Sequence, residues 1–137
     1  MRPQLHPDRW AIPYARIALA TAFLSSVAAR FGLWGRGWSG FGDFVAYTAE
    51  VNAFLPAFTI PAIAWAATIA ETVLGVALLA GWWLRGTALA SGVLLGLFAL
   101  AMAISLGVKE PLDYSVFSAS AAAFLLARHY APPEERR

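Results

Sequence analysis

Glu71 is the residue best placed for chemistry, because it is the one charged side chain within the apolar stretch Pro61–Leu84. A helix of that length, rising about 1.5 Å per residue, can cross a hydrocarbon core about 30 Å thick. A carboxylate near its centre costs about 2.5 to 3.5 kcal/mol on insertion scales, so it should face protein or water. Glu71 is therefore expected to be paired or protonated inside a group of helices.

The cation expected beside Glu71 is Arg16, about one turn inside the first apolar stretch of the chain. These two stretches are expected to run antiparallel, and a long guanidinium side chain can cover the remaining difference in depth. Thr68 and Thr72, on the same helix as Glu71, can supply further hydrogen bonds. The predicted interior polar site thus consists of Glu71, Arg16, Thr68 and Thr72.

Two functions are open for this interior site. A buried ion pair can fix the register of two helices without doing any chemistry. Alternatively, a protonated Glu71 can belong to a quinone or proton site, with Trp65, Phe98 and Phe117 able to line a hydrophobic pocket. The sequence assigns no catalytic residue in either case.

A second polar group is expected at the outer face, opposite the chain termini. Its members are Arg30, Asp43, Glu50, Lys109, Asp113 and Tyr114. Their shared height makes Arg30 a reasonable partner for Asp43 or Asp113, and the other interpretation is a cluster of separately solvated charges. Asp113 can also cap the helix that follows Pro111. The sequence contains no Ser-His-Asp set, no metal-ligand spacing and no phosphate-binding loop, so no metal site is predicted.

The composition indicates a membrane protein. Of the 137 residues, 60% are hydrophobic and 13% charged, against about 45–50% and about 25% in soluble domains. A formal charge of +2 without a basic cluster gives no reason to expect a nucleic acid partner. Cys is absent, which excludes disulfides, iron–sulfur ligation and thiol exchange within this chain.

The apolar pattern predicts an all-α fold: a single domain over 1–137 that forms an integral membrane four-helix bundle. The spanning helices are expected over about 12–34, 61–84, 87–108 and 113–130, with an interfacial amphipathic helix over about 41–56. The alternative for the first stretch is a signal peptide with its apolar region at 17–26 and small residues for cleavage at 25–29.

Small residues Ala88, Gly92 and Gly96 form a ridge with four-residue spacing on the third helix. Such a ridge lets another helix approach closely, either within the chain or across the seam of a homo-oligomer. With four spans, both termini lie on one side of the lipid bilayer. Most basic residues fall on that side, Arg2 and Arg137 among them, which predicts cytoplasmic termini in the cytoplasmic membrane.

The order of features along the chain resembles the DoxX family of small bacterial membrane proteins. The resemblance covers nearly the whole chain. It rests on FLSSVAARFGLWG (Phe23–Gly35), GDFVAYTAEVNAFLP (Gly42–Pro56), Thr68 and Glu71 before LGVALLAG, then FALAM, and KEPLDYSVFSAS (Lys109–Ser120). It implies that the polar family positions are Arg16, Arg30, Glu71, Arg85 and Asp113.

The same resemblance implies a four-helix membrane protein associated with redox enzymes, since some relatives are subunits of thiosulfate:quinone oxidoreductase. We therefore expect an accessory or quinone-facing subunit of a membrane redox process, with quinone as cofactor and a redox enzyme as partner subunit. It is not expected to be an enzyme by itself. The alternative is a non-enzymatic carrier, scaffold or assembly factor. The lack of Cys argues against a thiol relay in this chain.

Overall fold

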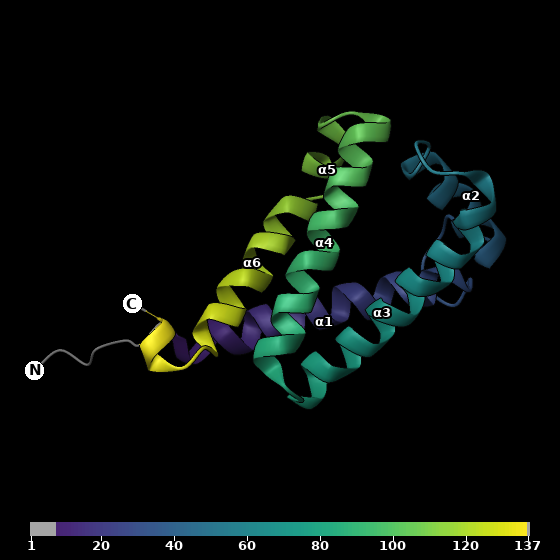
Figure 1. Cartoon of the computed structure of the whole chain (residues 1–137). Coiled ribbons are helices and arrows are strands. Elements are labelled where there is room, and N and C mark those ends of the chain that lie inside the picture. The colour runs from purple at the N-terminus through teal and green to yellow at the C-terminus, as the bar shows by residue number, and fades with distance from the viewer. Residues whose placement is uncertain (1–7, 137) are drawn as a thin grey trace, which may run out of the picture.

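The structure, a computed structural model, describes residues 8–136, and within that range the chain forms helices and no strand (Figure 1). The prediction of an all-α chain is confirmed. Arg2 and Arg137, which contributed to the predicted orientation, lie outside the described residues. In chain order the elements are α1 (Asp8–Arg30), α2 (Phe41–Val51), η1 (Ala57–Thr59), α3 (Ile60–Ala80), α4 (Leu84–Leu106), α5 (Lys109–Asp113), α6 (Val116–His129) and η2 (Pro133–Glu135).

The helices end earlier than the apolar pattern predicted, because glycines terminate them. The first helix was expected over 12–34, but α1 starts at Asp8 and ends at Arg30, just before Gly32, whose φ is 70°. α3 ends at Ala80 because Gly81 takes the left-handed conformation and its N–H donates to the carbonyl of Ala77. The apolar run then continues through a turn into α4, which starts at Leu84.

The last predicted helix, 113–130, corresponds to α6, which begins three residues later at Val116 and ends at His129, and the separate short helix α5 precedes it. Pro111 lies buried inside the short helix α5 instead of stopping the preceding helix. Asp113 ends α5 and does not cap α6, whose N-cap position is Ser115 with a left-handed φ of 56°. The predicted interfacial helix over 41–56 is shorter in the structure, since α2 ends at Val51 and η1 begins just beyond the predicted range.

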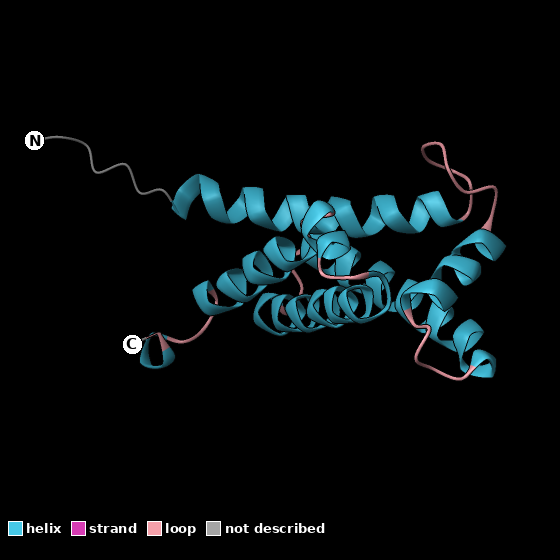
Figure 2. Cartoon of the chain, turned by 90° about the horizontal axis from the view of Figure 1, so that it is seen from above, coloured by secondary structure: helices cyan, strands magenta, loops and turns pink. Residues whose placement is uncertain are grey.

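The long helices pack as two antiparallel pairs, α1 with α3 and α4 with α6 (Figures 1 and 2). Glycines permit the close approach in each pair. A Cβ on Gly75 of α3 would lie 2.8 Å from Cγ of Leu24, and one on Gly92 of α4 would lie 2.9 Å from the ring of Phe124. Ser120 of α6 donates to the carbonyl of Gly92 at 2.7 Å. The ridge of small residues on α4 therefore serves packing within the chain.

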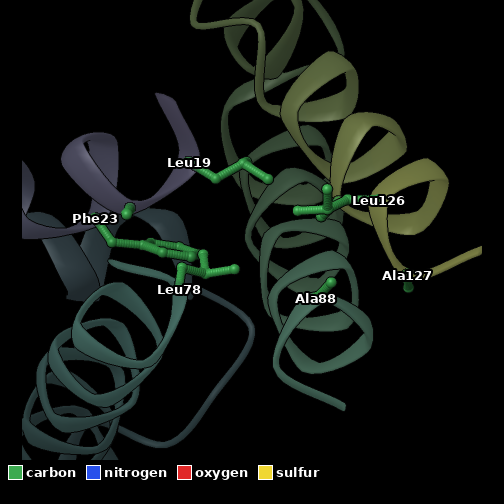
Figure 3. Close-up of a cluster of buried hydrophobic side chains, with 8 residues drawn as sticks. Leu19, Phe23, Leu78, Ala88, Leu126 and Ala127 are labelled. Atoms are coloured by element: carbon green, nitrogen blue, oxygen red, sulfur yellow. The ribbon is translucent and has the colours of Figure 1, made fainter. Parts of the chain in front are cut away.

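Four helices contribute to the main buried cluster, which lies toward the end of the molecule where α1 begins and α6 ends. Leu19 and Phe23 come from α1, Leu78 from α3, Ala88 from α4 and Leu126 from α6. Figure 3 shows Phe23 lying against Leu78, while Leu19 extends toward Leu126. The middle of α1 thus supplies residues to the core. These residues lie in the range 17–26, which the alternative interpretation assigns to a signal peptide.

The outward faces of the long helices are apolar. Exposed side chains include Ile69, Val73, Val76, Val93, Leu97 and Ile104. Within residues 8–136, three helical segments are long and apolar enough to cross a membrane: Asp8–Arg30, Ala57–Ala80 and Leu84–Leu106. The fourth predicted span is shorter, because α6 has 14 residues and so extends about 21 Å, less than a hydrocarbon core of about 30 Å.

Candidate functional site

Glu71 is buried and forms an ion pair with Arg30, the last residue of α1. Only 4% of the Arg30 side chain and 5% of the Glu71 side chain are exposed, so the pair is shut off from the surroundings. Arg30 also donates to Oγ1 of Thr68 at 2.9 Å and to Oγ of Ser26 at 3.2 Å. The guanidinium thereby joins two positions on α3 to a hydroxyl one turn back on its own helix.

Helix α2 closes the site from outside. Its buried residues Phe44, Thr48 and Val51 recur at helical spacing and form one face. The Phe44 ring lies beneath the Arg30 guanidinium, with 3.8 Å between Cζ and the ring centroid, and packs against Ala64 of α3. This cation–π contact covers a flat face of a cation whose two Nη groups already donate to Thr68 and Ser26.

The predicted pairing of Glu71 with Arg16 is wrong, and the register of α1 against α3 explains why. Leu24 lies level with Gly75, where the helices approach most closely. Because the helices are antiparallel, moving six residues toward the end of α1 reaches Arg30 on one side and the Thr68–Glu71 segment on the other. Arg16 lies at the far end of the pair, where its Nη1 is near Gly81.

The two threonines of the predicted site differ in role. Thr68 is buried, accepts the Arg30 hydrogen bond and donates to the carbonyl of Ala64 at 2.8 Å. Thr72 is half-buried and donates only to the carbonyl of Thr68, a local bond within its own helix. Thr68 therefore belongs to the site, and Thr72 lies beside it.

Replacing Thr68 with Val, which has nearly the same shape, is expected to lower the free energy of unfolding by about 1.5 kcal/mol. The variant removes a hydroxyl that accepts from a buried cation. Thr72→Val is the matched control, expected to change stability by less than about 0.5 kcal/mol. Thermal unfolding of both variants in the same detergent measures the difference, and equal effects would show that the Arg30–Thr68 bond contributes nothing.

Ser26 and Phe44 belong to the site although sequence reasoning did not place them there. Ser26 lies four residues before Arg30, which is one helical turn, so its proximity to Arg30 could have been inferred from spacing. Phe44 falls within the amphipathic helix predicted over about 41–56, but the sequence does not say what the apolar face of that helix covers. The predicted interior site is thus corrected to Glu71, Arg30, Thr68, Ser26 and Phe44.

The predicted outer cluster does not assemble around Arg30. Asp43 accepts hydrogen bonds from the backbone N–H of Ser39 at 2.7 Å and from its hydroxyl at 2.9 Å. Asp113 forms an exposed ion pair with Lys109, one turn earlier in α5. The pairing of Arg30 with Asp43 or Asp113 is therefore wrong, because each acid is occupied locally and Arg30 is drawn inward to Glu71.

Glu50 and Tyr114, the remaining members of the predicted cluster, are exposed. Both lie near enough to Tyr47 of α2 to affect its titration. Burial raises the pKa of the Tyr47 phenol, and Tyr114, Glu110 and Glu50 raise it further. The outer face thus consists of separate local contacts rather than one polar centre.

Asp43 gives the outer face a defined pH dependence. The hydrogen bonds from Ser39 hold the pKa of its carboxyl below the ordinary value of 3.8. The contact therefore stabilises the start of α2 at pH values above the unfolded pKa, and this stabilisation is lost as pH falls through the lower folded pKa. The Ser39 amide should stay protected from hydrogen exchange at pH values near the ordinary carboxyl pKa and lose protection only at more acidic pH. Asp43→Ala should remove this protection at all pH values, and loss of wild-type protection already near neutral pH would contradict the assignment.

Among the hollows on the surface of residues 8–136, two shallow apolar ones have linings that include neither Arg30 nor Glu71. One, of about 360 Å³, lies between α2 and the start of α3. The other, of about 450 Å³, lies between α3 and α4 and is lined by Ala70, Val73, Leu74, Ala90, Val93, Leu94 and Leu97.

The predicted pocket aromatics do not line either hollow. Trp65 lies 4.3 Å from Phe41, centroid to centroid, in an aromatic cluster that joins α2 to α3. Phe98 packs against the group around Phe44 and Ala64. Phe117 is half-buried on α6. The expectation of one aromatic pocket beside Glu71 is therefore not met.

Among residues 8–136, no group of His, Asp and Glu side chains could hold a metal ion. The chemistry available at the site is thus that of a sealed, hydrogen-bonded ion pair. Comparison of the chain with protein-family models, curated proteins and solved structures finds no match.

Proposed function

We propose that this chain is a small integral membrane protein that acts as a non-catalytic accessory or scaffold subunit in the cytoplasmic membrane. Its apolar outward faces and three helices of spanning length support insertion. In this proposal α6, extended by α5 at one end and Tyr130 at the other, is the fourth helix of a DoxX-like bundle. The resemblance to DoxX proteins in the segments around Arg30, Glu71 and Lys109–Ser120 supports that assignment.

The proposed orientation places both termini in the cytoplasm. The start of α1, the α3–α4 turn and the end of α6 lie toward one end of the molecule (Figure 1). Basic residues at that end are Arg9, Arg16, Arg85, Arg128 and Arg136, while Arg36 and Lys109 lie at the other end. Arg30 is neutralised by Glu71 and does not enter this balance. The excess favours the cytoplasmic side for the termini.

The observation that carries the non-catalytic assignment is the closure of the Arg30–Glu71 pair. A proton-transfer or quinone-reducing group needs access to its substrate, yet both side chains are about 95% buried and line neither of the two hollows. Such a pair instead fixes how α1 and α3 meet, since leaving either charge alone in a dry interior is costly. The scaffold reading therefore fits the geometry better than a reacting carboxylate does.

Quinone binding is the second candidate function, and the hollow between α3 and α4 favours it. Its lining is entirely apolar, it opens sideways, and Ala70 is adjacent in sequence to Glu71. An isoprenoid tail suits such a surface. In this alternative the chain supplies the hydrophobic part of a quinone site, and a partner redox enzyme supplies the chemistry.

Affinity purification of the full chain from its native membranes in mild detergent separates these functions. Native mass spectrometry and organic extraction then show what remains bound. A stoichiometric protein partner without quinone is the expected result. About one quinone per chain, lost in Leu97→Trp but kept in the control Ile104→Trp, would favour the second candidate. Recovery of the chain alone, without partner or quinone, would contradict both.

A further inference from the structure

Arg16 is a half-buried arginine that has no acid partner among the described residues. It lies on α1, and its Nε has no hydrogen-bond partner among the described residues. Among residues 8–136, the ion pairs join Arg30 to Glu71, Arg85 to Glu135 and Lys109 to Asp113, and none involves Arg16. Residues 1–7, which are outside the described range, contain neither Asp nor Glu. A buried donor normally has a partner. The Nε of Arg30 also lacks one, but the Arg30 guanidinium pairs with Glu71, whereas Arg16 has no acid partner among the described residues.

Within the protein, the positive charge of Arg16 is balanced only in part, by the C-terminal end of α3. The Nη1 of Arg16 lies near Gly81, at the end of α3, where the helix dipole is equivalent to roughly half a negative charge. The carbonyl of Ala77 there already accepts from the N–H groups of Gly81 and Trp82. A Cβ at position 81 would lie 3.7 Å from Nη1, which is an ordinary van der Waals distance, so the guanidinium packs beside the end of α3.

The surroundings of Arg16 fit the headgroup layer of a membrane. Trp82 and Trp83 follow Gly81 directly and are 74% and 78% exposed, and Tyr14 on α1 is 77% exposed. Exposed tryptophan and tyrosine side chains favour the depth of lipid headgroups. Two other arginines at this end are already engaged, since Arg85 pairs with Glu135 and Arg128 donates to the carbonyls of Glu135 and Arg136.

We propose that Arg16, between α1 and the end of α3, binds the phosphate of an anionic phospholipid. The guanidinium offers a fork of N–H donors that matches two phosphate oxygens. Basic sites between helices on the cytoplasmic side are suited to anionic headgroups. The proposal rests on the membrane insertion proposed above, and it assigns Arg16 a role distinct from the interior site for which it was first predicted.

The test uses the purified, delipidated full chain in a non-ionic detergent, with native mass spectrometry to count bound lipid. Phosphatidylglycerol is compared with phosphatidylcholine of the same acyl chains, for wild type, Arg16→Gln and Arg16→Lys. Arg36→Gln is the matched control, because Arg36 is an exposed arginine at the other end of the molecule. Helix content and unfolding temperature are measured alongside for each variant.

Wild type should prefer phosphatidylglycerol, and Arg16→Gln should bind it about five- to tenfold more weakly with phosphatidylcholine binding unchanged. Arg16→Lys should fall between them, because it keeps the charge but loses the fork. Equal binding by Arg16→Gln and Arg36→Gln would overturn the proposal, as would displacement of the lipid by inorganic phosphate, which would assign a free anion instead. If Arg16→Gln does not fold, absence of a phosphatidylglycerol preference in wild type overturns it equally. A chain that is soluble without detergent would instead refute the proposed function.

Discussion

Arg30→Met is expected to lower the free energy of unfolding by about 3 to 5 kcal/mol, the largest effect predicted for this chain. The substitution keeps a long side chain but leaves the Glu71 carboxylate without its cation in a closed interior. It also removes the donors to Thr68 and Ser26 and the cation above Phe44. Reversible unfolding of the protein in detergent, followed by circular dichroism, measures the loss.

The double variant Arg30→Met, Glu71→Leu tests the source of this loss. Either the intact ion pair stabilises the fold strongly, or the loss comes from leaving one buried charge without its partner. Replacing both charges with apolar groups removes the unpaired carboxylate, so much of the stability lost in the single variant should return. Arg36→Met serves as the control for loss of an arginine on the exposed loop. A single variant as stable as wild type would show that Glu71 is not confined with Arg30.

Leu78→Ala is expected to cost about 2 to 5 kcal/mol, because Leu78 is completely buried at the junction of α1, α3, α4 and α6. Its side chain lies against Phe23 (Figure 3). The substitution removes three carbons and leaves a cavity that the surrounding helices can fill only in part. The expected signs are a lower unfolding temperature and weaker protection of amides in α1 and α3 from hydrogen exchange.

Leu79→Ala, at the next position of the same helix, is the matched control. Leu79 is 45% exposed, and in the proposed membrane setting lipid chains fill the space that its truncation leaves. Its substitution should change stability by about 0.5 kcal/mol or less. Similar losses for both variants would mean that the outward face of α3 is buried against something other than lipid.

The apolar pattern was enough to predict the helical class and the positions of the long helices. Helix ends were less accurate, because the pattern continues through Trp82 and Trp83 while the backbone turns at Gly81. Nearer the end of the chain, the helix after Pro111 was expected to begin at Asp113, yet it begins at Val116 and a short helix contains both Pro111 and Asp113. Hydrophobicity reports where a segment is apolar, and local φ values decide where a helix ends.

The partner of Glu71 could not be derived in the same way, because it depends on the register between two helices. That register follows from Gly75, which allows Leu24 and Ala20 to approach α3 closely. With the first helix placed over 12–34, Arg30 was expected near the end of that helix, at the outer face of the bundle. The need of Glu71 for a basic partner was nevertheless predictable, because an isolated carboxylate in such a stretch is too costly.

The central claim is that lipid surrounds the outward faces of α1, α3 and α4 while Glu71 and Arg30 are enclosed between them. The natural absence of Cys makes single-site spin labelling direct. Labels at Val73→Cys and Leu97→Cys, in protein reconstituted into vesicles, should collide readily with oxygen and rarely with a water-soluble nickel complex. A label at Gly37→Cys, in the exposed loop after α1, should show the reverse. Ready collision of the nickel complex with labels at 73 and 97 would place water against these helices and contradict the claim.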